Sequence, residues 1–222
     1  MPNILPSKKG LIQGTPDSSQ AAARDEASGT HDDATGDEAI AVQWFRSSGR
    51  GGGTMRYVRT FLYFDTSGVT GTVASCQLRV EGGGSATNGD IIGVRSDAFG
   101  GDGGTDLHND DFNNIAWSTA YTNQLETWDS SGANTFTLTS DALTDMKNND
   151  YFIIALVEHD SDFQDTDTAD GAWYVGINFG GAIQLSFILA TGYGNAVNGV
   201  ASANIGKING AATADIDKVN GV

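Results

Sequence analysis

Short apolar segments separated by turn residues recur through the middle of the chain. The clearest lies at residues 74–81, where Ala74, Cys76, Leu78 and Val80 alternate with more polar residues. This period of two is typical of a strand with one buried face. Seven other segments have apolar patterns that predict strands: 39–45, 57–65, 89–94, 135–139, 151–158, 172–177 and 182–189. The pattern therefore predicts an all-β fold, and eight strands suit a jelly-roll β-sandwich.

The predicted sandwich spans residues 39–190, and the sequence on either side of it differs. Residues 1–38 are rich in Ser, Gly, Asp, Ala and Thr with little periodicity, which predicts an extended N-terminal arm that orders on assembly. Within the sandwich, residues 140–148 form the one helix-like segment, with Ser140 or Asp141 as its N-cap. Residues 191–222 form a distinct C-terminal tail.

The tail contains an internal repeat of 11 residues. Residues 197–207 read VNGVASANIGK, residues 208–218 read INGAATADIDK, and residues 219–222 begin a third copy. Each copy carries Asn-Gly, which favours a tight turn. So few copies bury too little apolar surface to fold alone, and such repeats become stable by stacking on neighbours. We therefore predict that the tail anchors or oligomerises the protein through its repeated aliphatic positions: Val197, Ile205, Ile208, Ile216 and Val219.

Charge and composition narrow the classes of function. The chain has 28 acidic and 12 basic residues, a net charge of −16, which argues against a nucleic-acid partner because phosphate binding requires a basic patch. Its three histidines lie in no recognisable nucleophile–base spacing, so we predict no enzymatic activity. Cys76 is the only cysteine, which excludes an intramolecular disulfide and favours a place in the core.

The N-terminal residues lack the continuous apolar region of a secretory signal. No segment reaches the roughly 18 apolar residues of a membrane span. The sequence therefore predicts a protein that is made in the cytoplasm and has no membrane partner.

One loop carries a cluster of carboxylates that could bind a cation. After the predicted strand at 151–158 come Asp160, Asp162, Asp165, Asp167 and Asp170. Closely spaced carboxylates become favourable around a hard divalent cation, and calcium accepts six to eight oxygen ligands. We predict a structural calcium ion here and no other cofactor. The alternative is a solvated acidic loop.

Aromatic and charged residues in the sandwich have two interpretations. Trp117, Tyr121, Trp128 and Trp173 could stack on sugar rings if they are exposed, but most aromatic residues of a sandwich pack in the core. Arg59 and Asp65 are expected to support the fold through hydrogen bonds or ion pairs.

Two segments resemble a known family. Residues 59–67, RTFLYFDTS, and residues 74–81, ASCQLRVE, resemble the paired-strand signature of the carbohydrate-binding-module-like jelly rolls called DNRLRE domains. Residues 134–163 resemble the same family in having a strand, a short helical turn and a long buried strand. The chain departs from the pattern at Thr66, where an aliphatic residue is usual, and in ending on FILA. The resemblance implies a jelly roll over about residues 39–190.

The tail resembles C-terminal repeats of the IxKVNGV kind in structural proteins of tailed phages. This second resemblance implies a virion protein, such as a capsid decoration, cement or head-fibre subunit. Its partners would be the major capsid protein or tail components together with further copies of itself, and it would leave the host by lysis. The alternative is a carbohydrate-binding module of a tail fibre or secreted protein that recognises a surface glycan. A polysaccharide-degrading enzyme is the least favoured interpretation.

Overall fold

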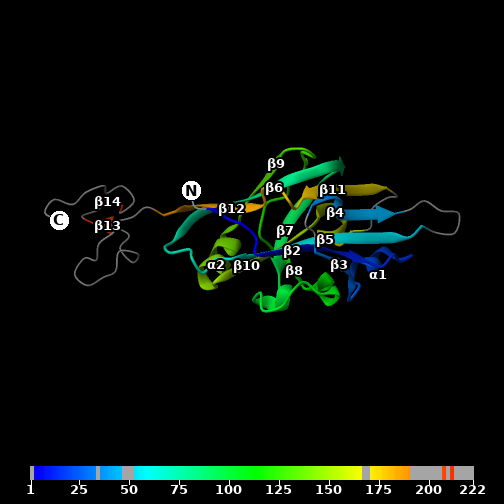
Figure 1. Ribbon diagram of the computed structural model, residues 1–222, viewed down its shortest axis with the longest axis horizontal. Helices are drawn as coiled ribbons and strands as arrows, with labels where there is room; N and C mark the ends of the chain where they lie inside the picture. The colour runs from blue at the N-terminus through cyan, green and yellow to red at the C-terminus, as the bar shows by residue number, and fades with distance from the viewer. Residues whose placement is uncertain are drawn as a thin grey trace.

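The computed structural model describes residues 3–33, 36–46, 53–166, 171–190, 207–208 and 211–212. Strands dominate this part of the chain, and twelve of them form one continuous hydrogen-bonded network with antiparallel pairing (Figure 1). The all-β, sandwich-like fold is therefore confirmed.

In the part of the chain that the structure describes, strands are joined by loops and short helical segments. The strands of the network are β1 (Asn3–Ile4), β2 (Lys8–Gly14), β3 (Gly29–Asp32), β4 (Asp37–Arg46), β5 (Met55–Asp65), β6 (Val73–Thr87), β7 (Ile91–Ser96), β8 (Ile115–Ala120), β9 (Ala133–Thr137), β10 (Tyr151–Glu158), β11 (Ala172–Asn178) and β12 (Gln184–Leu189). The helical segments are α1 (Gln20–Arg24), η1 (Phe99–Gly101), η2 (Asn109–Asn113), α2 (Ser140–Asn148) and the π-helical turn η3 (His159–Phe163).

The eight strands predicted from apolar patterns are all present. They correspond to β4, β5, β6, β7, β9, β10, β11 and β12, and β10 has the predicted bounds. The helix α2 also has the predicted bounds, but its N-cap is Thr139 rather than Ser140 or Asp141. The Thr139 side chain accepts a hydrogen bond from the backbone N–H of Ala142, one of the free donors of the first helical turn.

The prediction of an extended N-terminal arm over residues 1–38 was wrong for the described part of that segment. Strand β2 pairs with β5, from Lys8 opposite Tyr63 to Gln13 opposite Val58, and β3 pairs with β2. Gly10 allows this close packing, because a Cβ there would lie 2.7 Å from the backbone oxygen of Asp32. Gly10 is therefore required for the close packing of β2 against β3, although glycine is also common in irregular segments.

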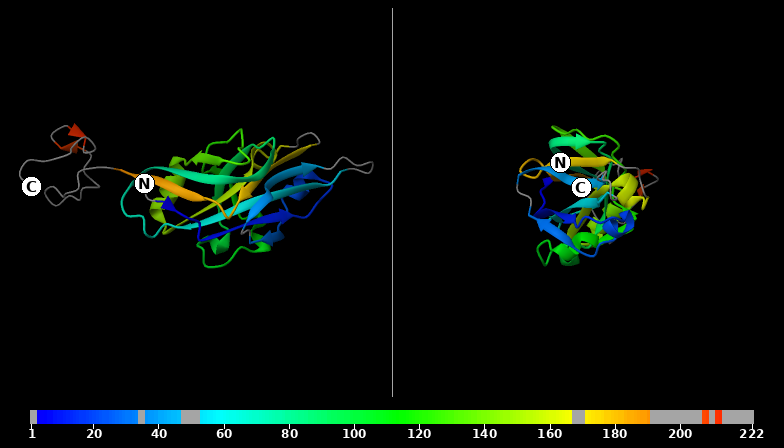
Figure 2. Two further views of the ribbon diagram at one scale, coloured as in Figure 1. Left: turned by 45° about the horizontal axis from the view of Figure 1, so that its top comes forward. Right: turned by 90° about the vertical axis from the view of Figure 1, so that its right-hand side faces the viewer.

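Strand β6 joins two parts of the strand network. The first part of β6 pairs with β12 and β9, and its last part pairs with β11. Along β5, strand β2 occupies one edge, while β4 and then β10 follow one another along the other edge. Figure 2 shows from two further sides that β6 and β9 lie across the molecule from β2 and β3.

Strand β10 separates two hydrophobic cores. Its residues Phe152, Ile154 and Leu156 belong to the first core, which includes Cys76 as predicted. The alternate residues Ile153, Ala155 and Val157 belong to the second core. The second core is closed by residues of α1, η1, η2 and the connecting loops: Ala23, Ala98, Phe99, Leu107 and Phe112. Both faces of the central strands are therefore buried.

In the tail, the structure describes one short strand pair. Strand β13 (Lys207–Ile208) pairs antiparallel with β14 (Ala211–Ala212), with Ile208 opposite Ala211. The two residues between them in the sequence are Asn209 and Gly210, one of the predicted turn sites. The other predicted assembly residues, Val197, Ile205, Ile216 and Val219, lie outside the described residues. Within the described ranges, no helix has the length and apolar character needed to cross a membrane.

The integration of the N-terminal segment can be tested at Ile12, which is fully buried in the second core. We expect Ile12→Ala to lower the free energy of unfolding by about 2 to 5 kcal/mol, the usual cost of truncating a buried aliphatic side chain. The matched control is Leu5→Ala, since Leu5 lies in the same segment and is 64% exposed. Equal unfolding curves for the two variants would show that the segment is an independent arm.

Candidate functional site

Among the residues that the structure describes, Arg59 on β5 is the most completely buried charged group, and its side chain has no exposed surface. Its Nη2 and Nε donate to the two carboxylate oxygens of Asp162, at 2.7 and 2.9 Å. Its terminal nitrogens also donate to the backbone oxygens of Phe112 and Arg24, both at 2.8 Å. The guanidinium carbon lies 4.0 Å from the centroid of the Phe112 ring. This set of partners offsets the cost of removing the charge from water.

The turn η3 that carries Asp162 is held by another buried carboxylate. Glu158, at the end of β10, accepts hydrogen bonds from the backbone N–H groups of Asp160, Ser161 and Asp162. Burial raises the pKa of Glu158 to about 7, although the three N–H donors favour its charged form. Burial also raises the pKa of Asp162, and the Arg59 guanidinium opposes that rise. Tyr57 extends the network through its hydroxyl, 2.6 Å from Ser161 Oγ.

The five aspartates predicted to bind calcium have separate surroundings where the structure describes them. Asp162 is paired with Arg59, and Asp165 forms an ion pair with Arg24. Asp160 lies beside His159. Asp167 and Asp170 lie outside the described residues. The calcium site therefore stays a prediction. Arg59 supports the fold as expected, and Asp65 closes the turn after β5 by accepting from Ser67 N and Oγ.

A second cluster brings together Asp90, His159 and Asp160. One ligand atom from each lies within 4.8 Å of the other two. The Nδ1 atom of His159 is 2.9 Å from Asp160 Oδ1 and 3.9 Å from Asp90 Oδ2. Burial raises the pKa of Asp90, and the nearby Asp160 carboxylate adds to that rise while the Gln124 hydrogen bond opposes it. The cluster thus combines one imidazole nitrogen with two carboxylates.

A groove lies on the face of β4 and β11. It has a volume of about 390 Å³ and is lined by Ala39, Ile40, Gln43, Phe45, Arg56, Ser85, Ala172 and Tyr174. Tyr174 is the cross-strand partner of Gln43. The Nε and Nη2 atoms of Arg56 donate to Gln43 Oε1, at 3.2 and 2.9 Å. The groove therefore offers two aromatic rings beside an ordered pair of polar side chains.

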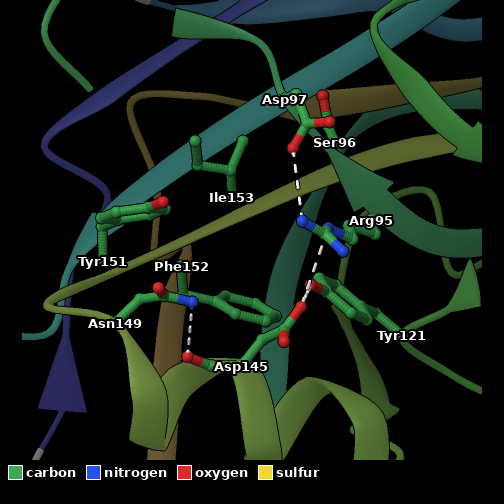
Figure 3. Close-up of a pocket in the computed structure, with 9 residues that line it drawn as sticks. All are labelled: Arg95, Ser96, Asp97, Tyr121, Asp145, Asn149, Tyr151, Phe152 and Ile153. Atoms are coloured by element: carbon green, nitrogen blue, oxygen red, sulfur yellow. Dashed lines mark hydrogen bonds and ion pairs between the residues drawn. The ribbon is translucent and has the colours of Figure 1, made fainter. Parts of the chain in front are cut away.

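A smaller pocket lies beside α2. Figure 3 shows Arg95 between the carboxylates of Asp97 and Asp145, each with a nitrogen–oxygen distance of 3.7 Å. The hydroxyl of Tyr121 donates to Asp145, and burial together with that carboxylate raises the pKa of Tyr121. The cavity volume of about 20 Å³ is enough for about one water molecule. This pocket is therefore too small for an organic ligand.

The aromatic residues proposed from sequence as sugar-stacking candidates contribute to the cores instead. Tyr121 is buried in the first core, and Trp128 packs against that core. Trp117 and Trp173 pack against the second core. The groove aromatics Phe45 and Tyr174 were not predicted, since the sequence does not reveal that β4 and β11 are neighbours.

Comparisons with protein-family models, with curated proteins and with solved structures found no match to this chain. The resemblances seen in the sequence therefore stay predictions.

The buried ion pair can be tested by a double-mutant cycle. We expect Arg59→Met and Asp162→Leu each to lower the free energy of unfolding by about 3 to 5 kcal/mol, because each leaves an unpaired buried charge. The double variant should lose far less than the sum of the two. As a control, Arg95→Met removes a half-exposed partner of Asp97 and should cost about 1 kcal/mol or less. Additive losses from denaturant melts would contradict a coupled pair.

Proposed function

We propose that this protein is a structural subunit of a phage particle, in the class of capsid decoration, cement or head-fibre proteins. The sandwich would project outward, and the repeat tail would attach it to the major capsid protein or to tail components. Its localisation would be the virion, reached by synthesis in the host cytoplasm and released by lysis. The repeats of the tail and their resemblance to tailed-phage proteins support this proposal.

The first and last strands of the sandwich pair with each other. This pairing favours attachment of the sandwich to the particle through one of its ends. Asn3 of β1 lies opposite Ser186 of β12, and Ile4 lies opposite Leu185. The hydroxyl of Ser186 also lies 2.9 Å from Asn3 Oδ1. The start of the described chain and the last strand of the sandwich therefore lie side by side, at one end of the sandwich in Figure 1. An attachment segment that follows β12 leaves the opposite end of the sandwich available to project outward.

The described strand pair in the tail also fits this role. Strands β13 and β14 have two residues each, and an isolated two-stranded hairpin is marginally stable at best in water. Such a unit gains stability when repeated copies pack on neighbouring chains. We therefore propose that the subunits form homo-oligomers or dock on the particle through the tail.

Removal of residues 197–222 tests this role. We expect the truncated protein to melt at nearly the same temperature as the full chain, because described residues of the sandwich, between positions 3 and 190, already build both cores. Incorporation into particles, measured by quantitative mass spectrometry of purified virions, should be lost.

Two substitution variants of the full chain provide matched controls for that truncation. Ile205→Ser combined with Ile216→Ser should reproduce the loss of incorporation. Ala201→Ser combined with Ala212→Ser, at another pair of equivalent repeat positions, should not. Full occupancy by the truncated protein would refute attachment through the tail, and absence of the full chain from purified particles would refute the proposed function.

A second candidate function is recognition of a surface glycan, and the groove on β4 and β11 favours it. Flat aromatic rings stack on sugar faces, and planar polar side chains such as Gln43 and Arg56 can exchange hydrogen bonds with hydroxyl groups. Phe45 and Tyr174 supply the rings in this groove. A tail-fibre module with this groove would adhere to its host through a surface polysaccharide.

The groove can be tested on an array of bacterial surface polysaccharides. Tyr174→Ala should weaken any binding about fivefold, since an aromatic contact contributes about 1 kcal/mol beyond its buried area. Ile188→Ala is the control, because Ile188 is another exposed strand residue, 49% exposed, on β12. If the full chain binds no polysaccharide, or if both variants bind equally well, the groove is not a glycan site.

A further inference from the structure

We propose that Asp90, His159 and Asp160 form a binding site for a divalent first-row transition metal, with zinc as the best fit. The site goes beyond the proposed structural role and does not depend on it. It also differs from the predicted calcium loop, with which it shares Asp160 alone.

The backbone places two of the ligands beside one another. Strands β7 and β10 pair with Ile91 opposite Glu158. Asp90 and His159 are the next residues beyond this pair on each strand. The backbone N–H of His159 donates to the backbone oxygen of Asp90 at 3.0 Å. The spacing of these two residues is thus fixed by the sheet rather than by a loop.

The ligand atoms are close to the separation that a metal ion requires. Zinc binds imidazole nitrogen and carboxylate oxygen at about 2.0 to 2.2 Å, so ligands of one tetrahedral ion lie roughly 3 to 3.5 Å apart. His159 Nδ1 is already 2.9 Å from Asp160 Oδ1 and 3.9 Å from Asp90 Oδ2. The Asp160 side chain is 55% exposed, so it can adjust without disturbing the core.

The surroundings of the ligands suit a metal centre. The other ring nitrogen of His159, Nε2, lies 3.2 Å from Gln164 Nε2, and the ring stacks on Phe163 with centroids 5.9 Å apart. When Nδ1 binds a metal, Nε2 carries the proton, and rotation of the Gln164 amide would bring its oxygen into place as the acceptor. The stacking on Phe163 holds the ring in its orientation. On the opposite side, Gln124 donates to Asp90 Oδ2 at 2.7 Å. Asp90 Oδ1 is buried and has no hydrogen-bond partner among the described residues, although a buried carboxylate oxygen normally requires one.

The mixture of ligand types selects the metal. Calcium and magnesium prefer sites made of oxygen ligands, whereas imidazole nitrogen suits zinc and its neighbours in the first transition row. The two carboxylates would neutralise the charge of a divalent ion. Three protein ligands also leave a coordination position for water or for a group from a partner.

The experiment uses the full chain after treatment with a chelator that is then removed. Titration with zinc chloride in a calorimeter should show one ion bound per chain, and zinc should raise the melting temperature. Asp160→Asn and His159→Gln should each weaken zinc binding at least tenfold. The matched control is His31→Gln, which removes an exposed histidine that contacts Asn109 and should leave zinc binding unchanged. Cobalt should give visible absorption bands in the full chain that the His159 variant lacks.

Each alternative result would overturn the proposal. If zinc does not bind, or binds equally well to the Asp160 and His159 variants, the cluster is an ordinary imidazole–carboxylate contact. If calcium raises the melting temperature and zinc does not, the predicted oxygen-rich loop is favoured instead. The Asp160 variant keeps the test valid if the His159 variant fails to fold, because the Asp160 side chain is largely exposed. None of these outcomes bears on incorporation into particles, so failure of this site and failure of the proposed function are distinguishable.

Discussion

The buried guanidinium of Arg59 determines how the outer segments of this protein attach to its sheet. A charge without access to water must be matched by a counter-ion and hydrogen-bond acceptors, or the folded state loses several kcal/mol. The acceptors of Arg59 come from three different segments: Asp162 in η3, Phe112 in η2 and Arg24 at the end of α1. One side chain on β5 thereby connects three segments that lie outside the strand network.

This connection is needed because the central strands are buried on both faces. A sheet with two apolar faces requires a cover on each, and the second core is covered by loops and short helices rather than by another complete sheet. Loops of this kind contribute few backbone hydrogen bonds to the sheet, so polar anchors such as Arg59 must hold them in place. The groove lies away from this interior, on the face of β4 and β11. The Asp90–His159–Asp160 cluster adjoins the interior, because His159 and Asp160 lie in η3 together with Asp162.

The sequence predicted those elements whose apolar pattern is local. Strand β6 alternates clearly over its first half because one face is buried and the other exposed. Strand β2 was missed because it is buried on both faces near its centre, so KKGLIQG shows no alternation. The helix α1 did have a signal, since Ser19 precedes a run of alanines and caps the helix by accepting from Ala22 N. That signal lies within a segment dominated by turn residues.

The candidate sites depend on contacts between distant parts of the chain, which periodicity does not reveal. Arg59 and Asp162 are 103 positions apart, and Asp162 stands in an acidic stretch that looked like a solvated or calcium-binding loop. Asp90 and His159 become neighbours only because β7 pairs with β10, two strands that are not consecutive. The sequence pattern predicts many of the strands, but it does not predict which strands are neighbours in the sheet.

The pairing of β1 with β12 also has a consequence for the outer edge of the sheet. An uncovered strand edge presents free backbone donors and acceptors, and it can recruit a strand from another molecule. Strand β1 covers Leu185 and Ser186 on that edge, and Pro6, which lacks an N–H group, follows shortly after it. Strand β1 thus shields part of the β12 edge from strand addition. Loss of β1 would open this part of the β12 edge and favour the addition of a strand from another molecule.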